Sequence, residues 1–255
     1  MSFMTLLKNE YFKSRIESYQ SIFPNLCRLY KQFKFKRKIQ KMKRKLIRNG
    51  VKYDKKTLFN DSNNSVLFIH IPKAAGMSVV KTLYKQTKSH HASASDYLNE
   101  DKDKFNNAFS FAITRNPYTR LYSAYNYLKN GGMNKIDLAW NELYIAKYDN
   151  FNDFIVSGGL EFAIEKNAEH FIPQYKFIFD EDDKLQCDYL GKIENIHKTE
   201  TLLTEKLQRK ILFTPTNVMN QCEPVLKDIY SDEMLAIVNK CYQKDFSLLV
   251  YDIQS

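Results

Sequence analysis

Cysteine is scarce in this chain, and the spacings that would give it a structural role are missing. Among 255 residues there are four cysteines, with no CxxC pair and no nearby pair of histidines. A zinc site and a disulfide framework are both disfavoured, because each needs ligands or partners at recognisable spacings. We therefore expect four free thiols, which suit a reducing compartment. The four are Cys27, Cys187, Cys222 and Cys241.

Long apolar runs are missing as well. No stretch approaches the roughly 18 consecutive apolar residues of a transmembrane helix. The first residues, MSFMTLLKNEYFKSRIE, have neither the apolar region nor the small-residue cleavage site of a secretory signal. We expect a cytoplasmic protein.

Acidic residues are nearly missing from one stretch, which explains the formal charge of +10. Residues 28–56, here called the basic stretch, hold fourteen Lys or Arg and one acid, so they carry +13 and the remaining residues carry −3. Apolar residues recur at helical spacing over 22–33 and 35–46. An N-terminal arm of one or two amphipathic helices, residues 1–60, is predicted. Asn49 and Gly50 are expected to end a helix, and the polar run at residues 60–65 is expected to be a linker.

Three functions fit the basic stretch. Amphipathic helices with basic faces bind anionic bilayers, and this reading places the protein peripherally at the inner face of the membrane. A solvated or oligomer-forming helix face is the second reading, and nucleic acid is the third. The third is disfavoured, because the globular part is not basic and the arm contains no known nucleic-acid module. We expect an anionic membrane surface.

Residues 61–255 form the second predicted domain. Residues 66–71 (VLFIHI) and 109–114 (FSFAIT) are short apolar runs typical of buried strands, and each leads through a loop into a helical pattern. A further short strand is expected near 187–193. Pro117 is expected in the first turn of the second helix, and Ser231 is expected to cap a later helix. Two strand-to-helix units about 45 residues apart predict an α/β fold with a central, mainly parallel sheet, helices on both faces and a helical C-terminal half.

The first of these loops, PKAAGMS at residues 72–78, has the chemistry of an anion site. A loop that leaves a parallel strand and opens a helix points backbone N–H groups at its ligand. Lys73 adds a mobile positive charge, and Ser78 adds a hydroxyl donor. The Walker pattern is absent because no glycine opens the loop and Lys73 precedes the small residues, so a nucleotide triphosphatase is disfavoured.

Several motifs in this chain resemble the carbohydrate sulfotransferases of the sulfotransferase family 2 type. FIHIPKAAGMS is similar to their 5′-phosphosulfate-binding loop, and RNPYTRLYSAY is similar to their 3′-phosphate-binding segment. The resemblance continues through HFIPQ, DYLGKIENI and CYQKDFSLLVYD, and so covers residues 65–252. It implies a sheet resembling a P-loop-kinase core and a donor, 3′-phosphoadenosine 5′-phosphosulfate (PAPS), whose product is 3′,5′-ADP. This chemistry requires no metal.

The resemblance also implies two anion clamps for the donor. Arg115 and Ser123 match the family's ligands of the 3′-phosphate, and Arg120 between them is either a further ligand or a structural residue paired with an acid. Lys73 is the natural group to stabilise the leaving oxygen. Met77 replaces the threonine usual in the 5′ loop. The expected 5′-phosphosulfate contacts are His70, Lys73, Ala74, Ala75, Gly76, Met77 and Ser78.

A general base with a pKa near neutrality points to histidine. His90 and His91 lie in SHHASASDYL, where related sulfotransferases place a catalytic histidine, and the AlaSerAla that follows His91 favours it over His90. A carboxylate or His170 is the remaining alternative. His70 ends a strand beside the loop, so it either contacts the phosphosulfate or caps the strand.

The acceptor side is predicted less directly. His170 and Gln174 are expected to face the acceptor cleft, with a structural tie between the helical region and the sheet as the alternative. Glu194 and Asn195 are read first as turn and cap residues and second as ligands. The resemblance implies a carbohydrate acceptor, a cell-surface polysaccharide or a glycolipid. The alternatives are sulfation of a lipid or small alcohol, and a non-catalytic nucleic-acid-binding protein.

Overall fold

The computed structural model describes residues 65–87, 89–214 and 226–255, together with residues 29, 33, 34, 37, 38, 40–44 and 59. Most of the basic stretch lies outside the described residues. So do the helix end expected at 49–50, residues 60–64 of the expected linker, and the cysteines Cys27 and Cys222. The described residues within 29–44 are helical, as their apolar spacing predicts.

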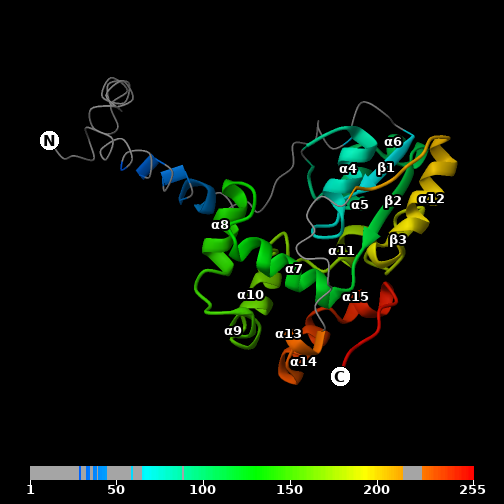
Figure 1. The fold of residues 1–255 in the computed structure, drawn as a ribbon. Helices are drawn as coiled ribbons and strands as arrows, with labels where there is room; N and C mark the ends of the chain where they lie inside the picture. The colour runs from blue at the N-terminus through cyan, green and yellow to red at the C-terminus, as the bar shows by residue number, and fades with distance from the viewer. Residues whose placement is uncertain are drawn as a thin grey trace, which may run out of the picture.

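Three parallel strands form the sheet, in the order β1 (Val66–Ile69), β2 (Phe109–Thr114) and β3 (Tyr189–Lys192). Phe68 pairs with Phe111 in one register, and Ile113 pairs with Gly191 in the other. The predicted parallel sheet is confirmed, and Figure 1 shows its strands side by side with β2 in the middle.

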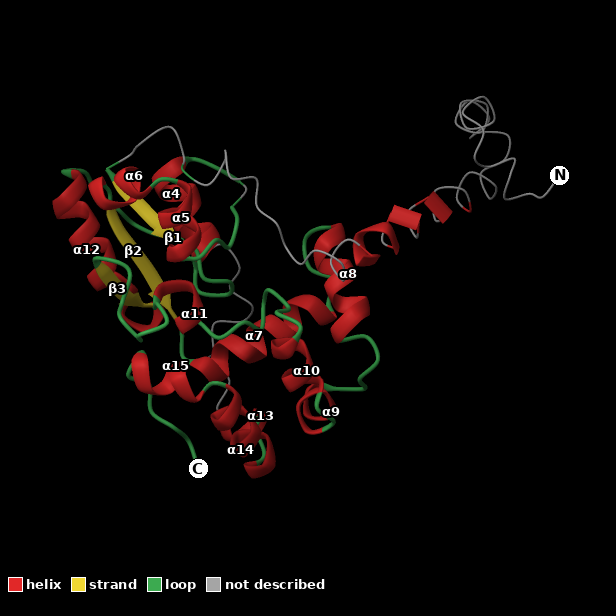
Figure 2. Ribbon diagram, turned by 180° about the vertical axis from the view of Figure 1, so that it is seen from behind, coloured by secondary structure: helices red, strands yellow, loops and turns green. Residues whose placement is uncertain are grey.

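Alternate residues of β1 face opposite sides of the sheet, as strand geometry requires. Val66 and Phe68 join a cluster with α4 (Gly76–Tyr84) and α12 (Ile196–Leu207), which begins directly after the short helix η2 (Ile193–Asn195). Leu67 and Ile69 join a cluster on the other face. The helices of that face are α5 (Ala94–Glu100), α6 (Lys102–Asn107) and α11 (Tyr175–Ile178). Helices therefore cover both faces, as predicted (Figure 2).

The helical half packs beside the sheet around α7 (Pro117–Lys129), which begins where β2 ends (Figure 1). Pro117 is the first residue of α7, and the Asn116 side chain accepts hydrogen bonds from the next two N–H groups, 3.0 and 3.5 Å away. The cap predicted at Ser231 is also present. The other helices are α8 (Lys135–Tyr144), α9 (Phe151–Val156), α10 (Gly159–Glu165), α13 (Leu226–Ile229), α14 (Asp232–Cys241) and α15 (Gln243–Leu248).

The described end of the arm contacts the helical half. Met42 packs against its core, and the Lys43 ammonium lies 3.3 Å from the Glu142 carboxylate on α8. Figure 1 shows this segment leaving the domain beside α8, away from the sheet. Within the part of the chain that the structure describes, no helix has both the length and the apolar character needed to cross a membrane.

Candidate active site

The loop at residues 72–78 joins β1 to α4 through two residues in left-handed backbone conformation. Lys73 has a φ of 68° and Ala75 a φ of 60°. Left-handed residues in a short loop turn successive N–H groups towards one side, which forms a concave anion site. The predicted strand, loop and helix unit is present, and its backbone has the geometry of such a site.

The backbone N–H groups of this loop fall into two sets. The N–H groups of Ala74, Ser78 and Val79 donate to carbonyl oxygens within the turn. Those of residues 75–77 make no hydrogen bond to any residue that the structure describes. They lie at the N-terminus of α4, where the helix dipole also favours an anion.

Lys73 rests on the helical half of the molecule. Its ammonium nitrogen lies 3.7 Å from the centre of the Tyr127 ring, on α7. Burial, and then the charges of Arg115 and Arg120, lower the pKa of Lys73 to about 8, although Asp137 acts in the opposite direction. The ammonium group therefore lies against α7, and it loses its proton at a lower pH than an exposed lysine does.

The small residues of the loop have a packing role that the sequence reasoning did not foresee. Ala74 is fully buried in the core beneath the sheet. Gly76 faces the His70 ring, because a Cβ built on Gly76 would lie 1.6 Å from the ring's Nε2 atom. Ala75 and Met77 are half-buried, so of the four residues these two keep exposed surface.

Ser78 differs from the expectation that its hydroxyl faces the donor. The side chain is buried, and its hydroxyl donates a short hydrogen bond to the carbonyl of Thr214. The segment at residues 211–214 covers this side of α4, because Ile211 and Phe213 pack into the same cluster as the helix. The Ser78 side chain therefore connects residues 211–214 to the loop at residues 72–78.

Arg115 stands at the corner where β2 gives way to α7. Its Nε atom donates to the Thr119 hydroxyl, 3.1 Å away, so the guanidinium folds back along the helix. Ser123, the other expected ligand of the 3′-phosphate, lies half-buried in the second turn of α7. The two predicted anion clamps therefore stand at the ends of neighbouring parallel strands, β1 and β2.

Gln174 is enclosed rather than exposed to a cleft. It has no exposed surface, and its side-chain amide bonds the backbone of Arg115 in both directions, at 2.9 Å to the N–H and 2.8 Å to the carbonyl. The buried carboxylate of Asp245 accepts from the Gln174 N–H, 2.9 Å away. This geometry fits the structural alternative, because Gln174 holds the Arg115 corner.

Arg120 is also structural, but its partners are carbonyl groups instead of the acid that the sequence suggested. The buried guanidinium donates to Pro72 at 2.9 Å, to Ile172 at 3.0 Å and to His170 at 3.5 Å. Arg120 thereby connects the loop at residues 72–78, the helix α7 and the turn at residues 168–172. Burial lowers the pKa of Arg120, but an arginine so bonded remains charged.

Three histidine rings meet beside this loop. His91 lies between the other two, with its ring centre 4.5 Å from that of His70 and 5.9 Å from that of His170. His90, the next residue, packs towards Tyr97 at 6.1 Å. The geometry therefore favours His91 over His90 as the reactive side chain, and it adds His70 and His170 as close neighbours.

Each outer ring has its own polar partner. The Nδ1 atom of His70 lies 2.8 Å from the Ser89 hydroxyl, and burial followed by the charge of His91 holds the pKa of His70 well below its ordinary value. The Nε2 atom of His170 lies 3.4 Å from Asp137, and burial lowers the pKa of His170 more than Asp137 raises it. Burial therefore favours the neutral form of both rings.

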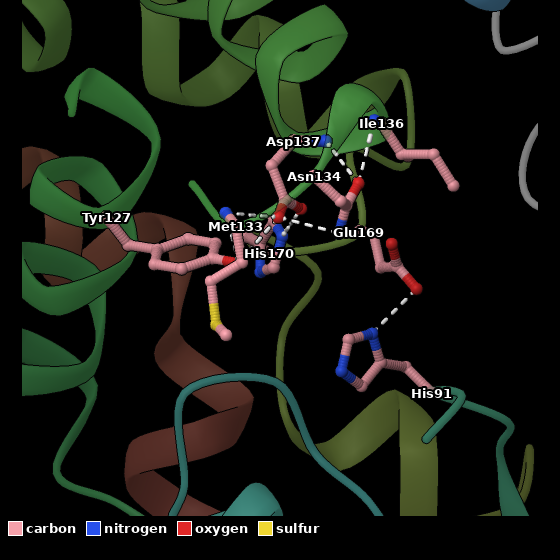
Figure 3. A network of polar contacts seen from close by, with 8 residues as sticks. All are labelled: His91, Tyr127, Met133, Asn134, Ile136, Asp137, Glu169 and His170. Carbon is pink, nitrogen blue, oxygen red and sulfur yellow. Dashed lines mark hydrogen bonds and ion pairs between the residues drawn. The ribbon is translucent and has the colours of Figure 1, made fainter. Parts of the chain in front are cut away.

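Two carboxylates complete the cluster, and neither belonged to the predicted site. The Glu169 carboxylate lies 2.7 Å from Nδ1 of His91 (Figure 3). Asp137, on α8, accepts from the Tyr127 hydroxyl at 2.5 Å and the Met133 N–H at 2.9 Å. Burial raises the pKa of Asp137, but these bonds and His170 outweigh it, so the pKa is lowered.

Glu194 has structural partners, as the first reading expected, whereas Asn195 stands at the N-cap position of α12 without capping it. Glu194 accepts from the Asn116 N–H at 2.7 Å and from the Tyr251 hydroxyl at 3.0 Å. It therefore connects the ends of β2 and β3 to the C-terminal segment. Asn195 precedes α12 and makes no side-chain cap bond.

A basic cavity adjoins the loop at Ser78. Its volume is about 620 Å³, and it runs between α4 and the segment after α12. Four of its side chains carry positive charge, so it suits an anionic or polar ligand. Its lining residues are Ser78, Lys81, Thr82, Lys85, Arg209, Lys210, Leu212 and Thr214.

Neither cysteine that the structure describes belongs to this site. Cys187 and Cys241 are free thiols, and burial raises their pKa values to about 12 and about 11, so they are poor nucleophiles. Among the described residues there is no group of three or more histidine, cysteine or acidic side chains arranged to hold a metal ion.

The site therefore combines a loop of open N–H groups, a lysine and an arginine on adjacent strand ends, and a histidine bonded to a carboxylate. No curated protein and no solved structure gives a significant match to the chain. A family model described as the sulfotransferase family matches residues 19–252, which includes much of the arm as well as both anion clamps. The chain belongs to the sulfotransferase family.

Proposed function

We propose that the protein transfers a sulfuryl group from PAPS to a hydroxyl of a carbohydrate. The observation that carries this proposal is the pair of cationic strand-to-helix corners, with Lys73 after β1 and Arg115 after β2, beside a carboxylate-bonded His91. PAPS has two separate anionic groups, and a protein that binds it needs two separate clamps. Family membership supports the reaction type.

The loop suits the 5′-phosphosulfate. The open N–H groups of residues 75–77 and the ammonium of Lys73 are donors of the kind that bind phosphate and sulfate oxygens. Arg115 and Ser123 are assigned to the 3′-phosphate. The basic cavity beside Ser78 offers room for the rest of the nucleotide.

The chemistry follows from these positions. The donor supplies an activated sulfuryl group and leaves as 3′,5′-ADP. His91 takes the proton of the acceptor hydroxyl as that oxygen bonds to sulfur, and Lys73 stabilises the negative charge on the bridging oxygen as its bond to sulfur breaks. Lys73 acts in its protonated form, because only an ammonium stabilises this charge.

The carbohydrate acceptor is inferred from the family resemblance. His170, Glu169 and Tyr127 give the cluster the hydrogen-bonding groups that a polyol needs. Sulfation of a lipid or small alcohol is the rival within the same chemistry. A polysaccharide or glycolipid is the preferred acceptor, because a polar cluster forms more hydrogen bonds with an acceptor that has several hydroxyl groups.

Two measurements test the function. Thermal unfolding should shift upwards with 3′,5′-ADP and not with ATP at the same concentration. Radiolabelled PAPS should then transfer label to at least one member of a panel of polysaccharides, glycolipids and small alcohols. His91→Ala should lower turnover roughly 100-fold or more with donor affinity little changed, whereas the exposed control His197→Ala should not. Absence of both donor binding and transfer would refute the proposal.

We further propose that the basic stretch holds the enzyme on an anionic membrane surface at the cytoplasmic face. Each Lys or Arg near such a surface contributes about 1 kcal/mol, so part of the +13 suffices for reversible attachment. The arm contacts α8 through Met42 and Lys43, and α8 also carries Asp137 of the cluster. Attachment would therefore bring the acceptor side towards lipid-linked glycans.

Vesicle sedimentation tests this attachment. The full chain should sediment with anionic vesicles at low salt and be released by salt, and it should ignore neutral vesicles. A chain that begins at residue 61 should lose this binding and keep transfer to a soluble acceptor. Equal failure of both chains to bind anionic vesicles would rule the attachment out, and preference for nucleic acid over vesicles would replace it.

A further inference from the structure

We infer that Glu169 is a positioning residue that fixes the tautomer of His91, so that Nε2 is the atom that accepts the acceptor's proton. The inference rests on the proposed sulfuryl transfer for its catalytic meaning. It names a residue that the two anion-binding motifs do not contain. Its basis is the contact between the two side chains and the way in which the chain holds Glu169 in place.

The contact itself assigns the proton. The Glu169 oxygen lies 2.7 Å from Nδ1 of His91, and the two side chains are only 12% and 18% exposed. A carboxylate is purely an acceptor, so Nδ1 must carry the hydrogen in this bond. In a neutral imidazole the lone pair then belongs to Nε2.

This arrangement accounts for the acceptor's proton at each step of the reaction. The acceptor hydroxyl gives its proton to Nε2, and the ring becomes an imidazolium while the new S–O bond forms. Glu169 keeps its own charge and stabilises the imidazolium through the existing bond, without taking a proton itself. The proton later leaves from Nε2 to solvent, which restores the starting tautomer.

The chain builds Glu169 into a fixed turn. The N–H of Ala168 donates to Ala163 at 2.8 Å, and the N–H of Phe171 donates to Ala168 at 2.8 Å. Arg120 binds two carbonyls of the same turn, those of His170 and Ile172. The carboxylate is therefore presented from a braced backbone, which a residue that orients a catalytic group requires.

The neighbouring pair has weaker geometry for the same task. His170 lies 3.4 Å from Asp137, and burial lowers the pKa of its ring. Its Nδ1 atom is buried and makes no hydrogen bond to the described residues. Of the two histidine–carboxylate contacts, only that of His91 and Glu169 combines a short bond with partial exposure to an acceptor.

Nitrogen NMR measures the tautomer directly and does not depend on turnover. In protein labelled with ¹⁵N-histidine, the signals of His91 are identified by their loss in His91→Ala. At a pH where the ring is neutral, the wild type should show protonated Nδ1 and unprotonated Nε2. Glu169→Gln should lose this form, because its amide can present an NH₂ group to Nδ1 instead of an acceptor. The exposed neighbour Glu165→Gln is the charge-matched control.

Kinetics then separates positioning from simple bracing. Glu169→Gln should lower kcat by roughly 10- to 1,000-fold with the KM for PAPS unchanged, and Glu169→Asp should recover part of the loss. A wild-type tautomer, or kcat within about twofold of wild type, would overturn the inference. So would a loss of thermal stability without a change of tautomer, because Glu169 would then only tie two loops together. A wild-type enzyme that transfers no sulfuryl group would instead refute the proposed function, and the NMR result would still stand.

Discussion

The imidazole of His70 occupies the space that a side chain on Gly76 would need. A Cβ on Gly76 would lie 1.6 Å from Nε2 and 1.9 Å from Cδ2 of His70. The residue directly after β1 and the first residue of α4 are thus packed against each other. Gly76 in the PKAAGMS loop is therefore needed to make room for the His70 ring. The absence of a side chain would also let an anion approach the backbone closely.

Gly76→Ala should therefore lower the free energy of unfolding by about 1 to 3 kcal/mol, the usual cost of overpacking a tight site. It should also weaken 3′,5′-ADP binding, because His70 is displaced towards His91. Denaturant unfolding and calorimetry measure the two effects. His70→Ala in the same chain should restore most of the stability. Gly158→Ala, where the nearest atom would be 4.0 Å away, should leave ADP binding unchanged.

Lys73 predicts a pH dependence of donor binding. Its pKa is lowered to about 8, so the side chain is charged below that pH and becomes neutral above it in the donor-free protein. An anion binds the charged form, so ADP affinity should be constant below pH 8. Above it, affinity should fall by up to roughly tenfold per pH unit. Calorimetry in buffers of different ionisation enthalpy should show proton uptake on binding above pH 8.

Lys73→Arg is the control for this assignment, because an arginine stays charged throughout the range. The variant should bind ADP with little dependence on pH between 7 and 9.5. The same fall in affinity in Lys73→Arg would show that another group titrates.

The two clamps should fail in different ways. Arg115→Ala should act mainly on donor affinity, and Lys73→Ala should act more on turnover, because Lys73 meets the charge that develops in the transition state. Losses of order 100-fold or more are expected. Steady-state kinetics with both substrates varied gives the two constants, with exposed Lys184→Ala as the control. Wild-type rates in either folded variant would remove that residue from the site.

Gln174 separates two readings of the HFIPQ motif. Gln174→Leu removes the partner of the Arg115 N–H, so it should lower the free energy of unfolding by about 1 to 3 kcal/mol and raise the KM for PAPS. The KM for the acceptor should change little. A rise in the acceptor KM alone would return Gln174 to the acceptor surface. Exposed Gln243→Leu should leave both constants unchanged.

The local features of this fold could be predicted from the sequence, because each depends on neighbouring residues. The runs VLFIHI and FSFAIT become β1 and β2, Pro117 opens α7, and Ser231 caps α14. The parallel pairing also followed, because each strand leads into a helix. The corners that carry Lys73 and Arg115 are the direct result.

The contacts between distant segments could not be predicted in this way. Glu169 and His91 are separated by 78 positions, and only the packing of two loops brings them together. Ser78 and Thr214 are 136 positions apart, so their contact could not be seen in the sequence. The sequence therefore suggested that the Ser78 hydroxyl binds a ligand, whereas in the structure it donates to the Thr214 carbonyl. Glu169 did leave one signal, since it directly precedes the HFIPQ motif.

Arg120 has a consequence for how the domain assembles. Its guanidinium donates to the carbonyl of Pro72, 48 residues earlier, and to that of Ile172, 52 residues later. A single buried side chain therefore connects three segments that are distant in the sequence. The contact with Pro72 ties the loop that follows β1 to α7, and the contact with Ile172 ties α7 to the turn at residues 168–172. A fragment that ends with α7 would contain both predicted anion-binding motifs and the contact between Arg120 and Pro72, but it would lack the contact between Arg120 and Ile172. Part of the hydrogen-bonding capacity of the buried guanidinium would be unsatisfied in such a fragment, so we expect the complete domain to hold the two motifs more firmly than a shorter chain would.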